Sequence, residues 1–325
     1  MMRTHEQLLR AASAAGFSSE PFEKVERLLD LLAGLDAHPY LKGRLALKGG
    51  TALNLFVLDL PRLSVDIDLN YIGAADRATM LAERPKVQQA VEAVCARLGL
   101  QVRRIPTDHA GGKWRLSYTT ASGRPGILEL DLNFLLRTPL WSVDRAAAQW
   151  VHGSEVVSYP VLDIHELAAG KLAALFGRTA GRDLYDAVQL LASNRLDTER
   201  LRLGFVVYGA MSRRDWRGVD SMELGTDAAE IERHVMPVLR GQARPAASDI
   251  DTWAASLVER VRNLLGAVLP FTESELAFLT AVNDKGEILP ELLTSDEALC
   301  EIIRIHPALL WKTQNVREFQ ERTRG

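Results

Sequence analysis

Alternating apolar and polar residues predict short strands in the first half of the chain. Such alternation is typical of a strand with one buried face. The strand-like runs are 44–48, 64–70, 101–105, 113–118 and 126–134. A glycine-containing turn at 108–112 joins the third run to the fourth. These runs predict a sheet in the first 160 residues.

Apolar residues at helical spacing predict helices around these strands and throughout the second half. The predicted helices are 4–15, 18–35, 84–98, 163–178, 182–191, 227–239, 248–268, 276–283, 295–305 and 306–323. Two capping boxes, Asp163 with Glu166 and Thr272 with Glu275, mark helix starts. The pattern therefore predicts an α/β fold, with a mixed-sheet domain over 1–160 and a mostly helical domain over 161–325.

A glycine pair follows the first predicted strand. Gly49 and Gly50 let the backbone turn sharply and approach a ligand closely. Thr51 is predicted to cap a helix that runs from residue 52 to about residue 58. The free N–H groups at a helix start favour phosphate, so this turn predicts a phosphate-binding loop.

Two aspartates follow on one face of the next strand. The alternation over 64–70 places Ser64, Asp66, Asp68 and Asn70 on the same side. Two carboxylates about 4 Å apart repel each other by roughly 1 kcal/mol in water, and by about 4 kcal/mol at an effective dielectric constant of 20. A half-buried pair therefore favours a cation, and Mg²⁺ suits oxygen ligands and substrate phosphates.

Each of these motifs alone is typical of an ordinary turn or a solvated strand, but their close succession indicates the triphosphate and metal site of a nucleotidyltransferase. No Gly-x-x-x-x-Gly-Lys-Ser/Thr loop and no Gly-x-Gly-x-x-Gly after a strand is present. A third carboxylate commonly binds the second metal in nucleotidyl transfer. Glu129 and Asp131 share one face of a predicted strand, so either could supply it, unless both are merely exposed strand carboxylates.

The segment 48–53 followed by 62–69 resembles the AbiEii/AbiGii-type nucleotidyltransferases, which are the toxin halves of AbiE-like toxin–antitoxin systems and include the MenT toxins. A second match is the series Lys171-x₆-Arg178-x₃-Arg182-Asp183-x-x-Asp186. The segment 306–312 is also similar, so the resemblance spans roughly residues 40–320.

The resemblance implies a role for each matching residue. Asp131 lies where the family carries an acidic residue, so it is preferred to Glu129 as the third metal ligand beside Asp66 and Asp68. The nucleotide-binding residues would be Lys48, Gly49, Gly50, Thr51, Ser64, Arg182 and Asp183, with Lys171 on the phosphates. The implied substrates are a nucleoside triphosphate and, in some relatives, the 3′ end of tRNA. A separate antitoxin protein is the implied partner.

An alternative for the second match is purely structural. Arg178, Arg182, Asp183 and Asp186 could form an ion-pair network between two helices, and for Arg178 and Asp186 this is at least as good an interpretation. Lys171 is interpreted as functional, because a point charge would offset negative charge on the leaving pyrophosphate.

Basic residues are concentrated over 171–217, where nine basic and five acidic residues give a local net charge of +4. Arginines near Trp216 predict an RNA-facing patch, because they suit phosphates and unstacked bases. A smaller cluster, Arg103, Arg104, Lys113 and Arg115, is interpreted as a solvated hairpin or as a rim that steers nucleic acid. Trp311 is interpreted as a core residue.

Composition and charge limit the class of protein and its compartment. The chain has 325 residues, is 47% hydrophobic and carries a net charge of −3, which excludes a uniformly basic nucleic-acid coat. Cys95 and Cys300 suggest neither a disulfide framework nor a zinc set. The first residues lack the apolar core of a signal peptide, and no apolar run has membrane-spanning length, so the cytoplasm is predicted.

Two other functions stay open from the sequence. One is a nucleotidyltransferase with a protein or small-molecule acceptor, and the other is a binding module that holds a nucleotide or partner without chemistry. The intact Asp66–Asp68 pair argues against the second.

Overall fold

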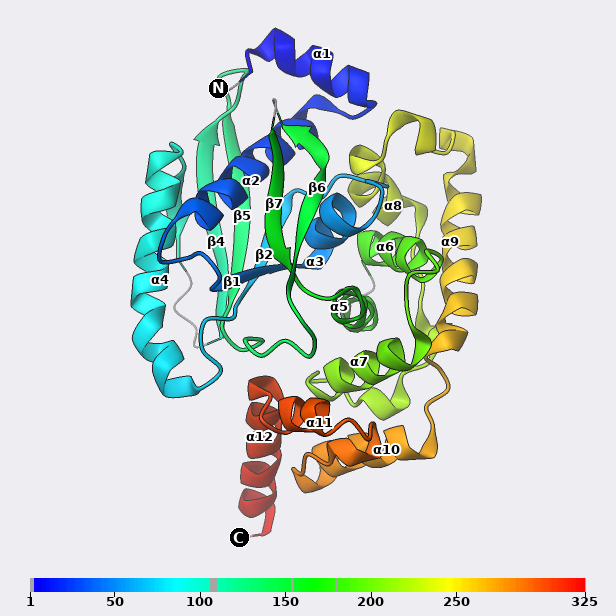
Figure 1. Ribbon diagram of the computed structural model, residues 1–325. Helices are drawn as coiled ribbons and strands as arrows, with labels where there is room; N and C mark the ends of the chain where they lie inside the picture. Colours follow the sequence, from blue (N-terminus) through cyan, green and yellow to red (C-terminus); the bar gives the residue numbers. More distant parts are fainter. Residues whose placement is uncertain (1–2, 106–109, 153–154, 179, 325) are drawn as a thin grey trace. The chain divides into compact units, whose positions relative to one another are not determined.

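The computed structural model describes residues 3–105, 110–152, 155–178 and 180–324 (Figure 1). The predicted turn at 108–112 lies partly outside these residues. The chain forms two compact units. Unit 1 comprises residues 1–137, 143–162 and 232–247, and unit 2 comprises 138–142, 163–231 and 248–325. The division into domains at residue 160 stays a prediction.

The described residues of unit 1 form one seven-stranded sheet with the strand order β3-β4-β5-β2-β1-β7-β6 (Figure 1). Its strands are β1 (Leu45–Lys48), β2 (Asp66–Tyr71), β3 (Gln101–Arg104), β4 (Gly111–Thr119), β5 (Pro125–Asn133), β6 (Asp144–His152) and β7 (Glu155–Val161). The β2–β5 and β1–β7 pairs are parallel and the other pairs are antiparallel, which confirms the predicted mixed sheet.

The last two strands, β6 and β7, were not predicted. β6 contains three consecutive alanines, Ala146 to Ala148, which are poor strand formers and show no alternation. β7 contains Pro160, which cannot donate a ladder hydrogen bond. In the part of the chain that the structure describes, β7 pairs with β1 through Leu47 and Val161 and with β6 at several positions, so neighbouring strands supply what local preference does not.

One face of the sheet is apolar and lies against two helices. Leu128, Leu130 and Leu132 of β5 are fully buried on it, and burying one leucine contributes roughly 1.5–3 kcal/mol. The helix α2 (Ser19–Ala37) crosses this sheet and contacts β5, β7 and the helix α4 (Arg77–Arg97) (Figure 1). The hydroxyl of Tyr71 on β2 donates to Glu83 of α4 at 2.6 Å.

The alternation of side chains along β2 places its aspartates on the face of the sheet opposite the helices. Because Tyr71, Ile67 and Leu69 point toward the helices, Asp66 and Asp68 point to the opposite side of β2. The first helix of the unit is α1 (His5–Ala15), and the helix-like segment that follows β1 consists of α3 (Gly49–Thr51) and η1 (Ala52–Val57).

Unit 2 is helical. Its helices are α5 (Ile164–Arg178), α6 (Gly181–Leu191), α7 (Thr198–Ala210), α9 (Ile250–Leu264), α10 (Glu273–Thr280), α11 (Glu297–Arg304) and α12 (Pro307–Arg324). The chain passes from unit 2 back to unit 1 within α8 (Ala228–His234). The short helical turns are η2 (Trp216–Gly218), η3 (Ser221–Glu223), η4 (Met236–Val238), η5 (Gly241–Ala243), η6 (Ala247–Asp249), η7 (Leu265–Ala267), η8 (Ala281–Lys285) and η9 (Pro290–Leu292).

The predicted mostly helical second half is therefore confirmed, although α7 was not predicted. The capping box of Thr272 and Glu275 is present at the start of α10. Among the described residues, no helix is both long and apolar enough to cross a bilayer.

The capping box predicted for Asp163 and Glu166 is wrong. Asp163 accepts from the N–H of His165 at 2.8 Å. Glu166 turns into the core instead, where its carboxylate accepts from the hydroxyl of Tyr208 at 2.9 Å and from the N–H of Leu140 at 3.0 Å. A buried carboxylate needs these donors more than the exposed helix start needs a second cap.

Glu166 makes the stability of the protein depend on pH. Burial raises the pKa of Glu166 from 4.5 to about 7. The neutral carboxyl therefore stabilises the fold fully below about pH 4.5, and roughly 3 kcal/mol of this stabilisation is lost as the pH rises through 7. We expect the melting temperature of Glu166→Gln to fall less than that of the wild type between about pH 5 and about pH 8. Glu199→Gln, at an exposed position of α7, is the control, and equal pH profiles for all three proteins would contradict the assignment.

Candidate active site

Strand register gathers the predicted carboxylates on the open face of the sheet. β2 lies between β1 and β5, with Asp68 paired to Lys48 on one side and to Asp131 on the other. Asp66 pairs with Glu129 in the same way. Neighbouring strands lie about 4.8 Å apart, so directly paired residues on one face have adjacent side chains. The structure therefore places Asp66, Asp68 and Asp131 on one face of two adjacent strands.

The glycine turn packs directly against one of these carboxylates. Gly49 has a φ of +72°, which L side chains rarely adopt. A Cβ atom added to Gly49 would stand 2.1 Å from Oδ2 of Asp68. Glycine is therefore required here twice, by the backbone conformation and by the space that the Asp68 carboxylate takes.

The prediction that Thr51 caps the following helix is wrong. The helical segment starts before Thr51, which itself has helical dihedral angles and makes no side-chain capping hydrogen bond. The hydroxyl of Thr51 donates instead to the backbone carbonyl of Asp66. The side-chain amide of Asn54 donates to the carbonyl of Gly50 at 2.9 Å. These two bonds tie the turn to β2 and to its own helix.

The helix after the turn is unusual, because residues 52–57 are π-helical. Such turns are rare and occur often at functional sites. Ser64 lies outside the strand that was predicted over 64–70, since β2 begins only at residue 66. The preceding backbone is held elsewhere: Arg62 bridges to Leu239, and the N–H of Leu63 donates to the carbonyl of Val238 at 2.8 Å. Ser64 itself is buried.

Glu129 and Asp131, the two candidates for the third metal ligand, have different surroundings in the structure. Glu129 accepts a hydrogen bond from Nζ of Lys113 at 2.8 Å and lies 3.8 Å from Nε of Arg115. Within the described part of the chain, Asp68 and Asp131 make no such hydrogen bond or ion pair. Glu129 therefore already has its cation, whereas Asp131 has room for one.

The electrostatics of Asp131 favour a bound cation. Burial raises the pKa of Asp131, the charge of Lys48 lowers it, and the neighbouring carboxylate of Asp68 raises it again, for a net increase. A carboxylate in this position is ionised less readily than an exposed one, and a divalent cation would restore the ionised form.

The carboxylates suit a Mg²⁺ ion whose coordination shell is completed by the phosphates of the substrate. Across residues 3–105, 110–152, 155–178 and 180–324, no three His, Cys, Asp or Glu side chains stand close enough to hold a metal by themselves. Mg²⁺ usually takes one or two protein carboxylates and completes its shell with waters and substrate phosphates. Asp68 and Asp131, adjacent on one face, supply such a pair.

The position of Lys113 was not predicted from the sequence. With Arg103, Arg104 and Arg115, it was interpreted as part of a solvated hairpin or of a rim that steers nucleic acid. In the structure it pairs with Asp131 across β4 and β5. Its hydrogen bond to Glu129 is the main cause of its raised pKa, and the charges of Asp66 and Asp68 raise the pKa further. Lys113 lies near these carboxylates because of the register between β4 and β5, and the periodicity of the sequence does not reveal that register.

The residues of the second match form one cluster in unit 2. Lys171 is buried, with Nζ 2.9 Å from Oδ1 of Asp183 and 2.8 Å from Oδ2 of Asp186. Nε of Arg178 lies 2.6 Å from Oδ2 of Asp183. Burial raises the pKa of Asp183, but Lys171 and Arg178 lower it by more, so the net change is a decrease. Arg182, on α6, is half-buried.

An ion-pair network between the two helices is therefore present for Arg178, Asp183 and Asp186, and it includes Lys171. The ammonium and the two carboxylates hold α5 to α6. A role for Lys171 on phosphates stays a prediction.

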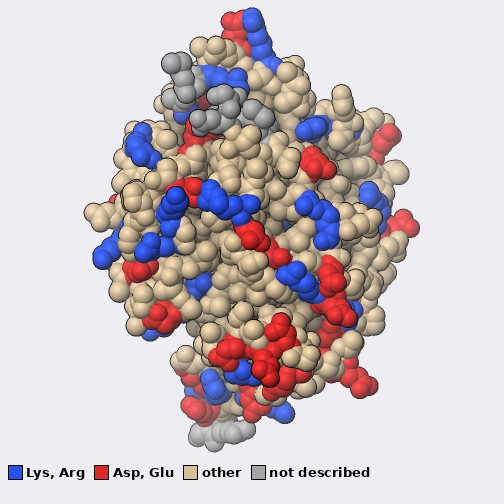
Figure 2. All heavy atoms as spheres, viewed as in Figure 1, with Lys and Arg blue, Asp and Glu red and all other residues tan. Residues whose placement is uncertain are grey.

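The basic segment 171–217 offers fewer free side chains for RNA binding than its sequence indicates. Trp216 does not lie beside exposed arginines for stacking: it is fully buried, and its ring centroid is 5.7 Å from that of Phe176 and 5.2 Å from that of Phe205. Most arginines of this segment are paired with acids: Arg178 with Asp183, Arg200 with Asp163, Arg202 with Glu275, Arg214 with Glu223, and Arg217 with Asp215 and Asp284. On the face shown in Figure 2, basic side chains are interspersed with acidic ones.

A mixed sheet that carries a Gly-Gly turn against an Asp-x-Asp strand defines a nucleotidyltransferase. The family model described as "Nucleotidyl transferase AbiEii toxin, Type IV TA system" matches residues 30–263. The chain belongs to this family, as its sequence motifs indicated. Its reaction is nucleotidyl transfer from a nucleoside triphosphate, and membership implies an antitoxin partner.

The fold has a close counterpart among solved structures. MenT4, a nucleotidyltransferase toxin from Mycobacterium tuberculosis H37Rv, matches with a TM-score of 0.63 at 18% sequence identity. The match covers 95% of this chain and 99% of that one. No curated protein sequence matches the chain.

The buried lysine gives a stability prediction. Lys171→Met removes the cation between two buried carboxylates, so we expect a loss of about 3–5 kcal/mol in the free energy of unfolding. Lys113→Met is the matched control: it also breaks a lysine–carboxylate pair, but an exposed one, and should cost less than about 1 kcal/mol. Urea unfolding followed by circular dichroism measures both. Equal stability of Lys171→Met and the wild type would show that the cluster is not structural.

Proposed function

We propose that this chain transfers a nucleotide from a nucleoside triphosphate to the 3′ end of tRNA, with Mg²⁺ held by Asp66, Asp68 and Asp131 together with the phosphates of the nucleotide, since the described carboxylates alone do not form a metal site. The observation that carries the metal site is the pairing of Asp68 with Asp131 beside the Gly49 turn. The tRNA acceptor rests on the resemblance to relatives that use it.

The phosphates of the nucleotide would lie at the glycine turn. Gly49 and Gly50 offer backbone N–H groups without side chains in the way, and the positive end of the following helical segment favours negative charge. Lys48, which pairs with Asp68 across the strands, supplies a positive charge at the same place. Thr51 and Ser64 are assigned to this site by the resemblance; both are buried, and Thr51 supports the turn through its hydrogen bond to the carbonyl of Asp66.

The acceptor hydroxyl attacks the α-phosphorus, the new P–O bond forms, and the bond to the β-phosphate oxygen breaks to release pyrophosphate. Mg²⁺, when bound, polarises the phosphate oxygens and offsets their charge. Asp131 accepts the proton of the attacking hydroxyl as the new P–O bond forms. Asp66 and Asp68 hold the metal on the adjacent strand.

Lys171, Arg182 and Asp183 are assigned to nucleotide binding by the resemblance. The ion pairs with Asp183 and Asp186 hold the ammonium of Lys171 in one position. The protein would act in the cytoplasm, and its antitoxin would control the activity.

The experiment incubates the purified full chain with Mg²⁺, total tRNA and each labelled nucleoside triphosphate in turn. We expect label on tRNA with the wild type and none with Asp66→Ala/Asp68→Ala. Asp131→Asn should lower the rate by about 10³-fold, the effect of several kcal/mol of lost charge stabilisation. Glu129→Gln, the neighbouring carboxylate on the same face, should retain the rate within about tenfold.

Each alternative has its own result. Full activity of Asp131→Asn with loss in Glu129→Gln would make Glu129 the third carboxylate. Label on a protein or small molecule instead of tRNA would overturn the proposed acceptor while preserving the reaction. Nucleotide binding without any transfer would support the non-catalytic module.

A further inference from the structure

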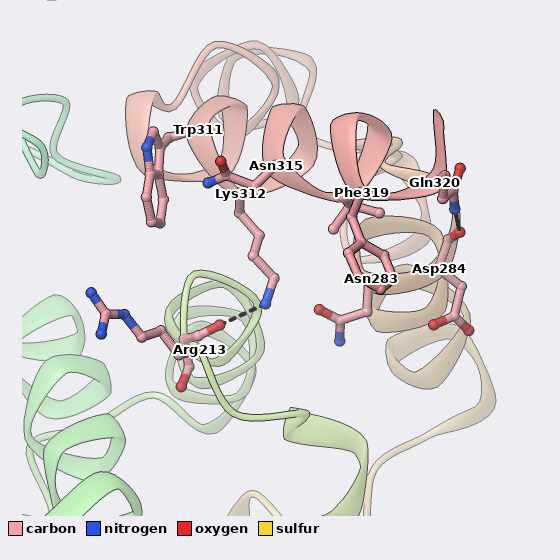
Figure 3. Close-up of a pocket in the computed structure, with 10 residues that line it drawn as sticks. Arg213, Asn283, Asp284, Trp311, Lys312, Asn315, Phe319 and Gln320 are labelled. Carbon is pink, nitrogen blue, oxygen red and sulfur yellow. Dashed lines mark hydrogen bonds between the residues drawn. The ribbon is translucent and has the colours of Figure 1, made fainter. Parts of the chain in front are cut away.

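A groove in unit 2 runs along one side of α12 (Figure 3). Its volume is about 500 Å³, within the range of roughly 300–1,000 Å³ typical of ligand pockets. The opposite wall comes from residues 212–213 and 283–284. Trp311 stands at one end of the row of side chains that α12 contributes to the groove, and Phe319 lies toward the other end, next to Gln320 (Figure 3).

The two aromatic side chains are exposed. Trp311 is 48% exposed and Phe319 is 71% exposed. The prediction that Trp311 belongs to the core is therefore wrong: α12 buries Leu309 and Thr313 and leaves Trp311 on another side of the helix. Exposed rings of this size commonly mark a binding surface.

The polar side chains of the groove carry a positive charge. Nζ of Lys312 donates to the backbone carbonyl of Ser212 at 2.8 Å, and burial lowers the pKa of Lys312 (Figure 3). Within the described residues, Arg213 makes no ion pair. The carboxylate of Asp284 lies 2.6 Å from Arg217, so its charge is already paired. The groove is thus complementary to an anion.

Amide groups complete the lining. Nδ2 of Asn283 is buried and has no hydrogen-bond partner among the described residues. Asn315 and Gln320 also line the groove, and Nε2 of Gln320 donates to the carbonyl of Asp284. An unpartnered buried amide is costly, and a ligand that accepts a hydrogen bond would remove that cost.

We propose that this groove binds unpaired nucleotides of an RNA strand, with bases stacked on Trp311 and Phe319 and phosphate on Arg213 and Lys312. Flat apolar faces, cations and amide donors together match a base and its phosphate. The rings are eight residues apart on one helix, about 12 Å along its axis, which a few nucleotides span. The proposal deepens the proposed function, on which its choice of RNA rests.

The other candidate occupant is a helix of the antitoxin, which could use the aromatic rings as anchors. The cations and the unpartnered amide favour RNA, because an apolar helix face would leave both unsatisfied.

The test measures RNA binding without any triphosphate, so that catalysis plays no part. Fluorescence anisotropy of a labelled short single-stranded RNA is followed as the full chain is added, and a blunt RNA duplex serves as the comparison. We expect tight binding of the single strand only. Trp311→Ala and Phe319→Ala should each weaken it by about tenfold or more, as expected for a lost base stack. Arg213→Glu should weaken it and reduce its salt dependence.

Two controls separate the groove from general effects. Leu310→Ala removes an exposed apolar side chain of the same helix, and Arg10→Glu makes the same charge change on the exposed surface of α1. Both should bind RNA like the wild type. Melting temperatures verify that the exposed substitutions Trp311→Ala and Phe319→Ala leave the fold intact.

Unchanged RNA binding by Trp311→Ala and Phe319→Ala would overturn the proposal. Loss of antitoxin binding by those variants, with RNA binding unchanged, would assign the groove to the protein partner. If these substitutions weaken RNA binding but the wild type transfers no nucleotide to RNA, the groove stands and the proposed acceptor fails. If transfer to tRNA proceeds and both variants bind and react like the wild type, the proposed function stands and the groove assignment fails.

Discussion

The position of β2 between β1 and β5 is the constraint on which the candidate site depends. Its register sets Asp68 beside Lys48 on one strand and beside Asp131 on the other. A shift of β2 by one residue would turn Asp66 and Asp68 toward the apolar face. Ile67, Leu69 and Tyr71 forbid that shift, because they would lose their burial on that face. The hydrophobic face of the sheet therefore holds the polar face in place.

The same site shows why carboxylates that look equivalent differ. Asp131 and Glu129 are two residues apart on one strand face, yet Lys113 pairs with Glu129 and leaves Asp131 without an ion pair in the described chain. Asp68 is in turn pressed against Gly49, which places a potential phosphate loop next to a potential metal ligand. In unit 2, by contrast, the carboxylates beside Lys171 are already paired within the fold.

The sequence predicted the features that follow from the local spacing of apolar residues. The period of two in β2 was enough to place Asp68 on the polar face, and the helical spacing of the second half was enough to predict a helical unit. The partners across space were not predictable: Thr51 bonds β2 instead of capping a helix, and Lys113 reaches the carboxylates through strand register. Trp311 looked apolar and therefore buried, but the packing of α12 leaves it exposed.

The central claim is that Asp68 and Asp131 form a metal site that is completed by the phosphates of the nucleotide. Calorimetric titration of nucleoside triphosphate into the protein, with and without Mg²⁺ and without any acceptor, tests it most directly. The account predicts that Mg²⁺ tightens binding to the wild type and to Glu129→Gln, but not to Asp68→Asn or Asp131→Asn. Equal tightening by Mg²⁺ in all four proteins would contradict it.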